Sequence, residues 1–131
     1  MLQMNMAVVP NYRLDEIWAK IDEGKVFFSH NQARSIKAVI LVYSCAPGNS
    51  VKSFAEAERF ILDELKRLKN VDFYSTGYQN FICTDIYGKV IDGKPWFIKF
   101  GIDDDDLDLI SFHPPKDSML LQSGVTIPKG A

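Results

Sequence analysis

The chain has 131 residues, of which 47% are hydrophobic and 24% charged, and its formal net charge is -2. This composition is typical of one globular domain and argues against intrinsic disorder, which needs low hydrophobicity and high net charge. It also lacks an overall basic surface for nucleic acid, and two cysteines are too few for a disulfide framework or a cysteine zinc site.

The longest apolar run, Ala38–Tyr43, is too short to span a bilayer. Met1–Pro10 has no basic residue before its apolar stretch, so we expect a loose arm here rather than a secretory leader. We therefore expect a cytoplasmic protein with a single domain over residues 1–131 and no membrane partner.

Helical patterns dominate the first half of the chain. An apolar spacing of three to four residues predicts a helix that ends at Gly24, and Lys25–Phe28 then favours a short strand. Residues 33–45 fit a helix or a buried strand, and the capping box of Ser29 and Gln32 favours the helix. A third helix is predicted from the capping box of Ser53 and Glu56 to about Asn70.

Strand patterns follow, at residues 71–74, 81–87, 96–102 and 107–112. Trp96, Ile98 and Phe100 alternate with Phe97 and Lys99, as in a sheet with one buried face. We expect an α+β fold in which the helices pack on one face of an antiparallel meander. Two prolines end the last strand, and the tail over residues 114–131 either docks back through Met119–Leu121 or frays.

Five acidic residues are concentrated at Asp103–Asp106 and Asp108. Adjacent carboxylates on a turn diverge, which favours a solvated hairpin turn over a cation site. An extended segment from Leu107 to His113 would place this turn about 20 Å from His113, beyond a Debye length at physiological salt.

His113 is the strongest candidate for chemistry, because it lies where the chain leaves the sheet and an imidazole titrates near neutral pH. RNA cleavage without a metal needs a base for the 2′-hydroxyl, a cation for the phosphate and an acid for the leaving oxygen. Lys99, on the neighbouring predicted strand, could supply the cation. The competing interpretation is a surface histidine beside a solvated lysine.

The other chemistry-bearing residues favour structural roles. His30 lies in the first turn of the second predicted helix, where the helix dipole disfavours its protonation. Cys45 and Cys83 are expected to be buried free thiols. Aromatic residues could stack on bases or fill the core, and for Trp96 the core is favoured.

Four segments together resemble the MqsR family of bacterial toxins, within the RelE-like group of small ribonucleases. They are Asp72–Tyr74, Ile82–Tyr87, Trp96–Lys99 and Ile110–His113. The resemblance covers about a third of the chain. At positions where the family pattern has Lys, Gln, Tyr and Lys, this chain has Ser75, Thr84, Phe97 and His113.

The resemblance implies an endoribonuclease that cleaves messenger RNA without a metal or cofactor and is neutralised by a cognate antitoxin. In this hypothesis the catalytic residues are His113, Lys99 and Tyr87. Tyr74, Ser75, Thr84, Phe97 and Arg34 form the substrate-binding set. His113 serves as general acid or base, Lys99 or Arg34 stabilises the phosphate, and Tyr74 or Tyr87 positions a base.

A second hypothesis assigns the same α+β fold to a protein without catalytic activity. In it, the chain is an immunity or antitoxin-type protein that covers a basic partner with its acidic hairpin by electrostatic complementarity.

Overall fold

A computed structural model describes residues 8–28, 32–43, 51, 53–79 and 81–130. Three helices precede most of the strands, which confirms the α+β class. The helices are α1 (Leu14–Asp22), α2 (Gln32–Tyr43) and α3 (Phe54–Leu65), followed by a short 3-10 turn (Asn70–Asp72). The strands are β1 (Val26–Phe27), β2 (Phe73–Gln79), β3 (Ile82–Ile91), β4 (Lys94–Asp103), β5 (Asp106–His113), β6 (Met119–Leu120) and β7 (Thr126–Ile127).

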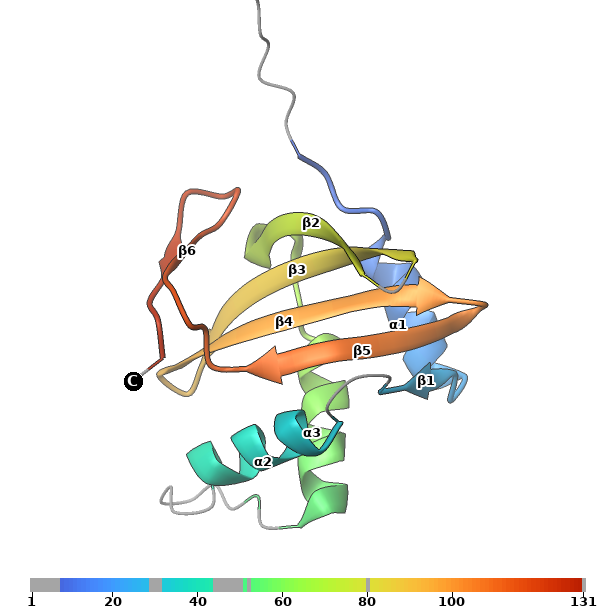
Figure 1. The fold of residues 1–131 in the computed structure, drawn as a ribbon, viewed down its shortest axis with the longest axis horizontal. Helices are drawn as coiled ribbons and strands as arrows, with labels where there is room; N and C mark the ends of the chain where they lie inside the picture. The colour runs from blue at the N-terminus through green and yellow to red at the C-terminus, as the bar shows by residue number, and fades with distance from the viewer. Residues whose placement is uncertain (1–7, 29–31, 44–50, 52, 80, 131) are drawn as a thin grey trace, which may run out of the picture.

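Five strands form one sheet in the order β1-β5-β4-β3-β2, in which β1 runs parallel to β5 and all other neighbours are antiparallel. In Figure 1, β4 and β5 cross in front of α1 and α3, so helices cover one face of the sheet. The short hairpin β6-β7 lies at the end of the sheet where β5 finishes. The predicted meander is therefore confirmed, as is the helix over residues 33–43.

Tight turns connect the long strands. Asp92 and Gly93 join β3 to β4 with φ of 50° and 79°, and Asp104 and Asp105 join β4 to β5 with φ of 50° and 76°. Two consecutive residues with positive φ match the right-handed twist of a hairpin, and Asp and Gly tolerate this conformation better than most residues. Residues Asp103–Asp106 thus form a hairpin turn, as predicted, whereas Asp108 lies within β5 and is buried rather than solvated.

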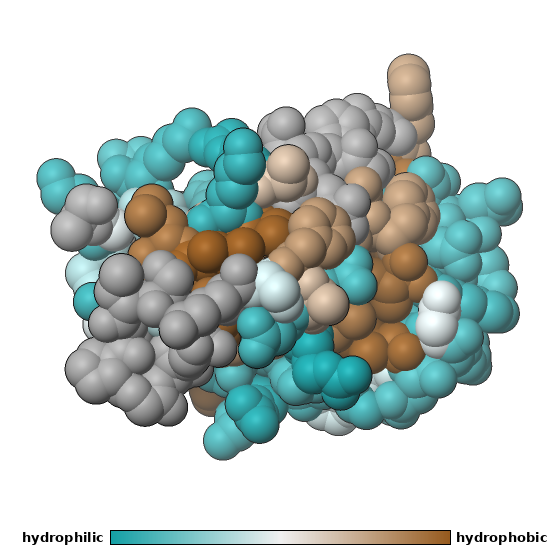
Figure 2. Space-filling model, turned by 90° about the horizontal axis from the view of Figure 1, so that it is seen from below, coloured by the Kyte–Doolittle hydropathy of each residue, from teal (hydrophilic) through white to brown (hydrophobic). Residues whose placement is uncertain are grey.

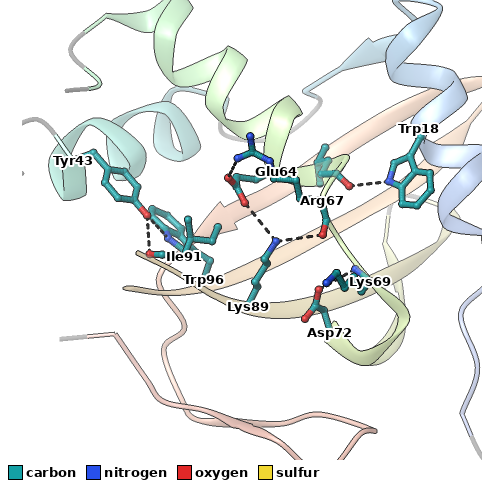
Figure 3. A network of polar contacts seen from close by, with 10 residues as sticks. Trp18, Tyr43, Glu64, Arg67, Lys69, Asp72, Lys89, Ile91 and Trp96 are labelled. Carbon is teal, nitrogen blue, oxygen red and sulfur yellow. Dashed lines mark hydrogen bonds and ion pairs between the residues drawn. The ribbon is translucent and has the colours of Figure 1, made fainter. Parts of the chain in front are cut away.

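The main core lies between the helices and the sheet. Trp96, Ile98 and Phe100 on β4 are fully buried, whereas Phe97 and Lys99 between them point to the other face. Trp96 donates its indole N–H to Tyr43 Oη at 3.1 Å, and that hydroxyl donates to the backbone oxygen of Ile91 (Figure 3). Both polar groups of this aromatic pair are thereby satisfied inside the core.

The end of α3 is fixed by polar contacts, and it comes earlier than the predicted Asn70. Trp18 on α1 donates its indole N–H to the carbonyl oxygen of Leu65 at 3.0 Å, which satisfies a terminal acceptor of the helix (Figure 3). The buried carboxylate of Glu64 pairs with Arg67 at 2.8 Å and with Lys89 of β3 at 3.5 Å. These bonds tie the helix end to both α1 and the sheet.

The start of α1 is anchored by a buried carboxylate on β3. Asp85 accepts hydrogen bonds from the backbone N–H groups of Asn11 at 2.8 Å and Tyr12 at 2.9 Å. The segment that enters α1 is therefore held against the sheet. Residues 1–7 of the predicted arm lie outside the described residues.

A second, smaller apolar cluster lies on the opposite face of the sheet. Met119, Leu121 and Ile127 are buried there against Tyr74, Ile86 and Phe97. The tail also bonds to strand β2 of the sheet, because the Gln122 N–H donates to the Phe73 carbonyl at 3.1 Å. Of the two predicted outcomes for the tail, docking is the one observed.

Two other predictions need correction or lie outside the described part of the chain. Cys83 is exposed rather than buried, because it pairs with the exposed Tyr78 near the β2-β3 turn. The strand expected at residues 71–74 begins only at Phe73, after the 3-10 turn. His30 and Cys45 lie outside the described residues.

Apolar residues also reach the surface on the side of α2. Figure 2 shows hydrophobic residues forming a band there between hydrophilic flanks. Near it in the fold, Ile21, Phe27 and Leu62 line a pocket of about 450 Å³ between α1, β1 and α3. Among the helices that the structure describes, none has the length and apolar character needed to cross a membrane.

Candidate functional site

The face of the sheet opposite the helices carries two adjacent rows of side chains. The strand register places Gly88, Phe97 and His113 in one row across β3, β4 and β5. Ser75, Ile86, Lys99 and Ser111 form the next row. Residues that are diagonal neighbours across antiparallel strands lie about 7–8 Å apart, so Lys99 lies within reach of a ligand that contacts His113.

A pocket of about 320 Å³ opens at the first of these rows. Tyr74, Phe97 and His113 line its sheet side. Its other wall is the segment from Lys116 to Met119, which enters the β6-β7 hairpin. The sheet therefore supplies a rigid floor, and the docked tail supplies a wall.

His113 is held in place and kept neutral by its surroundings. Its Nδ1 lies 2.8 Å from the carbonyl oxygen of Pro114, and its ring stacks on Phe97 with centroids 5.1 Å apart and planes 13° apart. Since a carbonyl only accepts, Nδ1 carries the proton and Nε2 is left as the basic nitrogen. Burial, together with the positive charges of Arg34 and Lys116, lowers the pKa of His113 below 6.5.

Positive charges surround this base. Lys99 makes no hydrogen bond or ion pair with another described residue, and partial burial lowers its pKa. Arg34 is exposed at the start of α2, near enough to act on the His113 charge. Lys116 adds a third cation in the pocket wall, while Asp117 beside it adds one negative charge. The arrangement suits an anionic group bound near a neutral imidazole.

Four of the predicted site residues come together as expected. Tyr74, Phe97 and His113 line the pocket, and Lys99 lies in the next row. Ser75 is in that same row, two strands away from Lys99, and does not line the pocket.

Tyr87 and Thr84 are not where the hypothesis needs them. Tyr87 pairs with Ile98 on the helix side of the sheet, is fully buried, and packs between Phe73 and Phe100. Burial raises the pKa of its phenol, so it neither reaches a substrate nor ionises. Thr84 is also fully buried, in a row beyond Lys99, and we assign neither residue to the pocket.

Sequence reasoning missed the tail side of the pocket. Lys116, Asp117 and Ser118 come from a segment without a strong helix or strand pattern, and only the short apolar stretch after them indicated docking. Ser111 was missed as well, although its alternation with His113 along β5 places both side chains on one face.

The acidic turn is remote from this pocket. Strand β5 begins at Asp106, beside the turn, and ends at His113, so the two lie at opposite ends of the sheet (Figure 1). Asp105 pairs with Lys25 at 2.9 Å and also with Lys20, and these lysines lower its pKa to about 2. The turn therefore docks on α1 and on Lys25, the residue just before β1, and the charge of Asp105 is used within the chain.

The pocket combines a base, nearby cations and aromatic surfaces, which are the groups needed to hold a phosphodiester and remove a proton beside it. Among the described residues, no three His, Cys, Asp or Glu side chains gather in an arrangement suited to a metal ion. No protein-family model matches this chain, and no curated protein matches its sequence.

Proposed function

We propose that this protein is a metal-independent endoribonuclease whose catalytic base is His113. The observation that carries the proposal is the neutral, stacked imidazole in a pocket whose surroundings supply Lys99, Arg34 and Lys116. The resemblance to MqsR-like toxins alone carries the finer parts: messenger RNA as substrate, a cognate antitoxin as partner, and a toxin-antitoxin role.

The proposed step is an internal transfer within the RNA strand. His113 Nε2 takes the proton of a 2′-hydroxyl, and the 2′-oxygen attacks the adjacent phosphorus. The bond between phosphorus and the 5′-oxygen breaks, and water protonates the leaving oxygen. The products are a 2′,3′-cyclic phosphate and a 5′-hydroxyl, and Lys99 stabilises the charge that develops on the phosphate.

The aromatic residues support the binding of single-stranded RNA. Tyr74 and Phe97 present ring surfaces beside His113 in the pocket. Stacking of a nucleobase on an aromatic side chain contributes about 1–3 kcal/mol. A flexible single strand can place both a base and its phosphate in a pocket of this size.

The test is cleavage of a long single-stranded messenger RNA in EDTA, with His113→Ala compared against the parent. His30→Ala is the matched control, because His30 is the only other histidine in the chain. We expect fragments with 2′,3′-cyclic phosphate ends from the parent and His30→Ala, none from His113→Ala, and none from a strand made of 2′-deoxynucleotides.

The opposite result is also informative. If His113→Ala cleaves as fast as the parent, His113 is not the catalytic base. If the folded parent leaves the RNA intact, the ribonuclease proposal itself fails. The binding-protein hypothesis would then take its place. In that case Asp103 and Asp104, the exposed carboxylates at the turn that form no ion pair with the described residues, would be the first residues to examine.

A further inference from the structure

The two edges of the five-stranded sheet are protected to very different degrees. At one edge lies β1, which is only two residues long, and a short edge strand offers little for another chain to pair with. The other edge is β2, with seven residues and the sequence FYSTGYQ. It contains no charged residue and no proline, the two features that most often block an edge from pairing.

The register shows which backbone groups of β2 point outward. Gln79 pairs with Ile82 across a two-residue connection, and such a closing pair exchanges backbone hydrogen bonds. Hydrogen-bonded pairs alternate along an antiparallel ladder, so Gly77 and Ser75 also bond inward to β3. Thr76 and Tyr78 lie between them, and their N–H and C=O groups therefore face away from the sheet.

The tail covers only the first part of this edge. Gln122 donates its backbone N–H to the Phe73 carbonyl at 3.1 Å and its side-chain amide to the Tyr74 carbonyl at 2.9 Å. Within the described part of the chain, Thr76 and Tyr78 receive only a weak contact, from Ser75 Oγ to the Thr76 carbonyl at 3.4 Å.

We infer that β2 pairs with β2 of a second copy of this chain, antiparallel and centred on Gly77. In that register Thr76 of one copy exchanges both hydrogen bonds with Tyr78 of the other, and the two-fold axis repeats the exchange. The two Gly77 residues meet at the non-hydrogen-bonded centre, where they bring no side chains that could clash. The uncharged edge also meets itself without like-charge repulsion.

The side chains next to the β2 edge also favour pairing with a second copy of this chain. Tyr78 is 68% exposed and Phe81, at the β2-β3 turn, is 92% exposed. Pairing sets Tyr78 beside Thr76 of the other copy, and aromatic residues pair well with β-branched residues across strands. The dimer would be a continuous ten-stranded sheet, and the proposed catalytic residues Lys99 on β4 and His113 on β5 lie away from the pairing edge.

The experiment is sedimentation velocity over a wide concentration range, together with amide hydrogen exchange resolved by NMR. We expect a concentration-dependent dimer, in which the Thr76 and Tyr78 amides become protected as the dimer forms. The Ser75, Gly77 and Gln79 amides should be protected in both forms. Tyr78→Lys should abolish the dimer, whereas Leu41→Lys, which adds the same charge on the exposed side of α2, should leave it intact.

A monomer at every concentration would overturn the inference, as would a dimer that leaves the Thr76 and Tyr78 amides unprotected. A monomer whose edge amides become protected only on adding another protein would assign the edge to a different partner. Amide exchange in the wild-type protein shows whether β2 pairs with a second copy, even if Tyr78→Lys does not fold.

Discussion

His113 combines a fixed tautomer with a lowered pKa, and this combination predicts a pH profile. The neutral form is the base, so kcat/KM should rise with pH and level off above a pKa lower than 6.5. Removing the positive charge of Arg34 should raise that pKa, since this charge is one cause of the shift. We expect Arg34→Ala to move the NMR titration of the His113 ring to higher pH.

Lys37→Ala is the control, because Lys37 is exposed on the same helix and does not contribute to the His113 shift. An unchanged titration in Arg34→Ala would show that the guanidinium does not act on the imidazole.

Tyr87 gives a sharper test of the site, because its hydroxyl is buried and makes no hydrogen bond with the described residues. A buried hydroxyl without a partner costs about 1–3 kcal/mol in desolvation. Tyr87→Phe should therefore leave the free energy of unfolding unchanged or raise it by up to about 1 kcal/mol. RNA cleavage should stay at the parent rate. If Tyr87→Phe lost most of the RNA cleavage at normal stability, Tyr87 would be a catalytic residue after all.

At the scale of elements, ion pairs of Asp105 hold the β4-β5 turn to Lys20 of α1 and to Lys25, just before β1. The folded-state pKa of about 2 lies below the usual 3.8, so the folded state favours the ionised carboxylate. This contribution is fully present above about pH 4 and is lost as the pH falls from about 4 to about 2. Asp105→Asn should thus be less stable than the parent at pH 7 in urea unfolding, and the difference should shrink through that window.

Asp103→Asn is the matched control, since it changes the same turn at a residue without an ion pair among the described residues. A difference between Asp105→Asn and the parent that persists unchanged at pH 2 would mean that the ion pairs do not cause it. Added salt should also narrow the difference, because the pairs are partly exposed and therefore screened.

At the scale of the whole molecule, the fold was more predictable than the site. Alternation on β4 separated Trp96 from Phe97 correctly, because a half-buried sheet imposes a period of two on its strands. The same rule could not show which face Tyr87 joins, since both faces of this sheet bury apolar residues at that end. Nor could a local pattern show that Lys116 folds back beside His113, because that contact depends on tertiary docking of the tail.

The sheet therefore carries two apolar clusters of unequal size, and the smaller one builds the pocket wall. A Cβ on Gly88 would lie 3.0 Å from the end of Met119 and 3.2 Å from Ile127. Gly88→Val should thus push the β6-β7 hairpin away from the sheet, at a cost of roughly 1–3 kcal/mol for overpacking. The helix-side core should still unfold cooperatively, because Gly88 faces away from it.

Amide exchange measures this directly. In Gly88→Val we expect faster exchange at Leu121 and Ile127, with little change at Trp96 or Phe100, and a loss of RNA cleavage. Gly93→Ala is the control, because its φ of 79° makes the substitution strained while nothing lies within 4 Å of the added carbon. It should lower overall stability without selective exposure of the hairpin. Equal loss of protection in both clusters of Gly88→Val would mean that the sheet and its two layers unfold only as one unit.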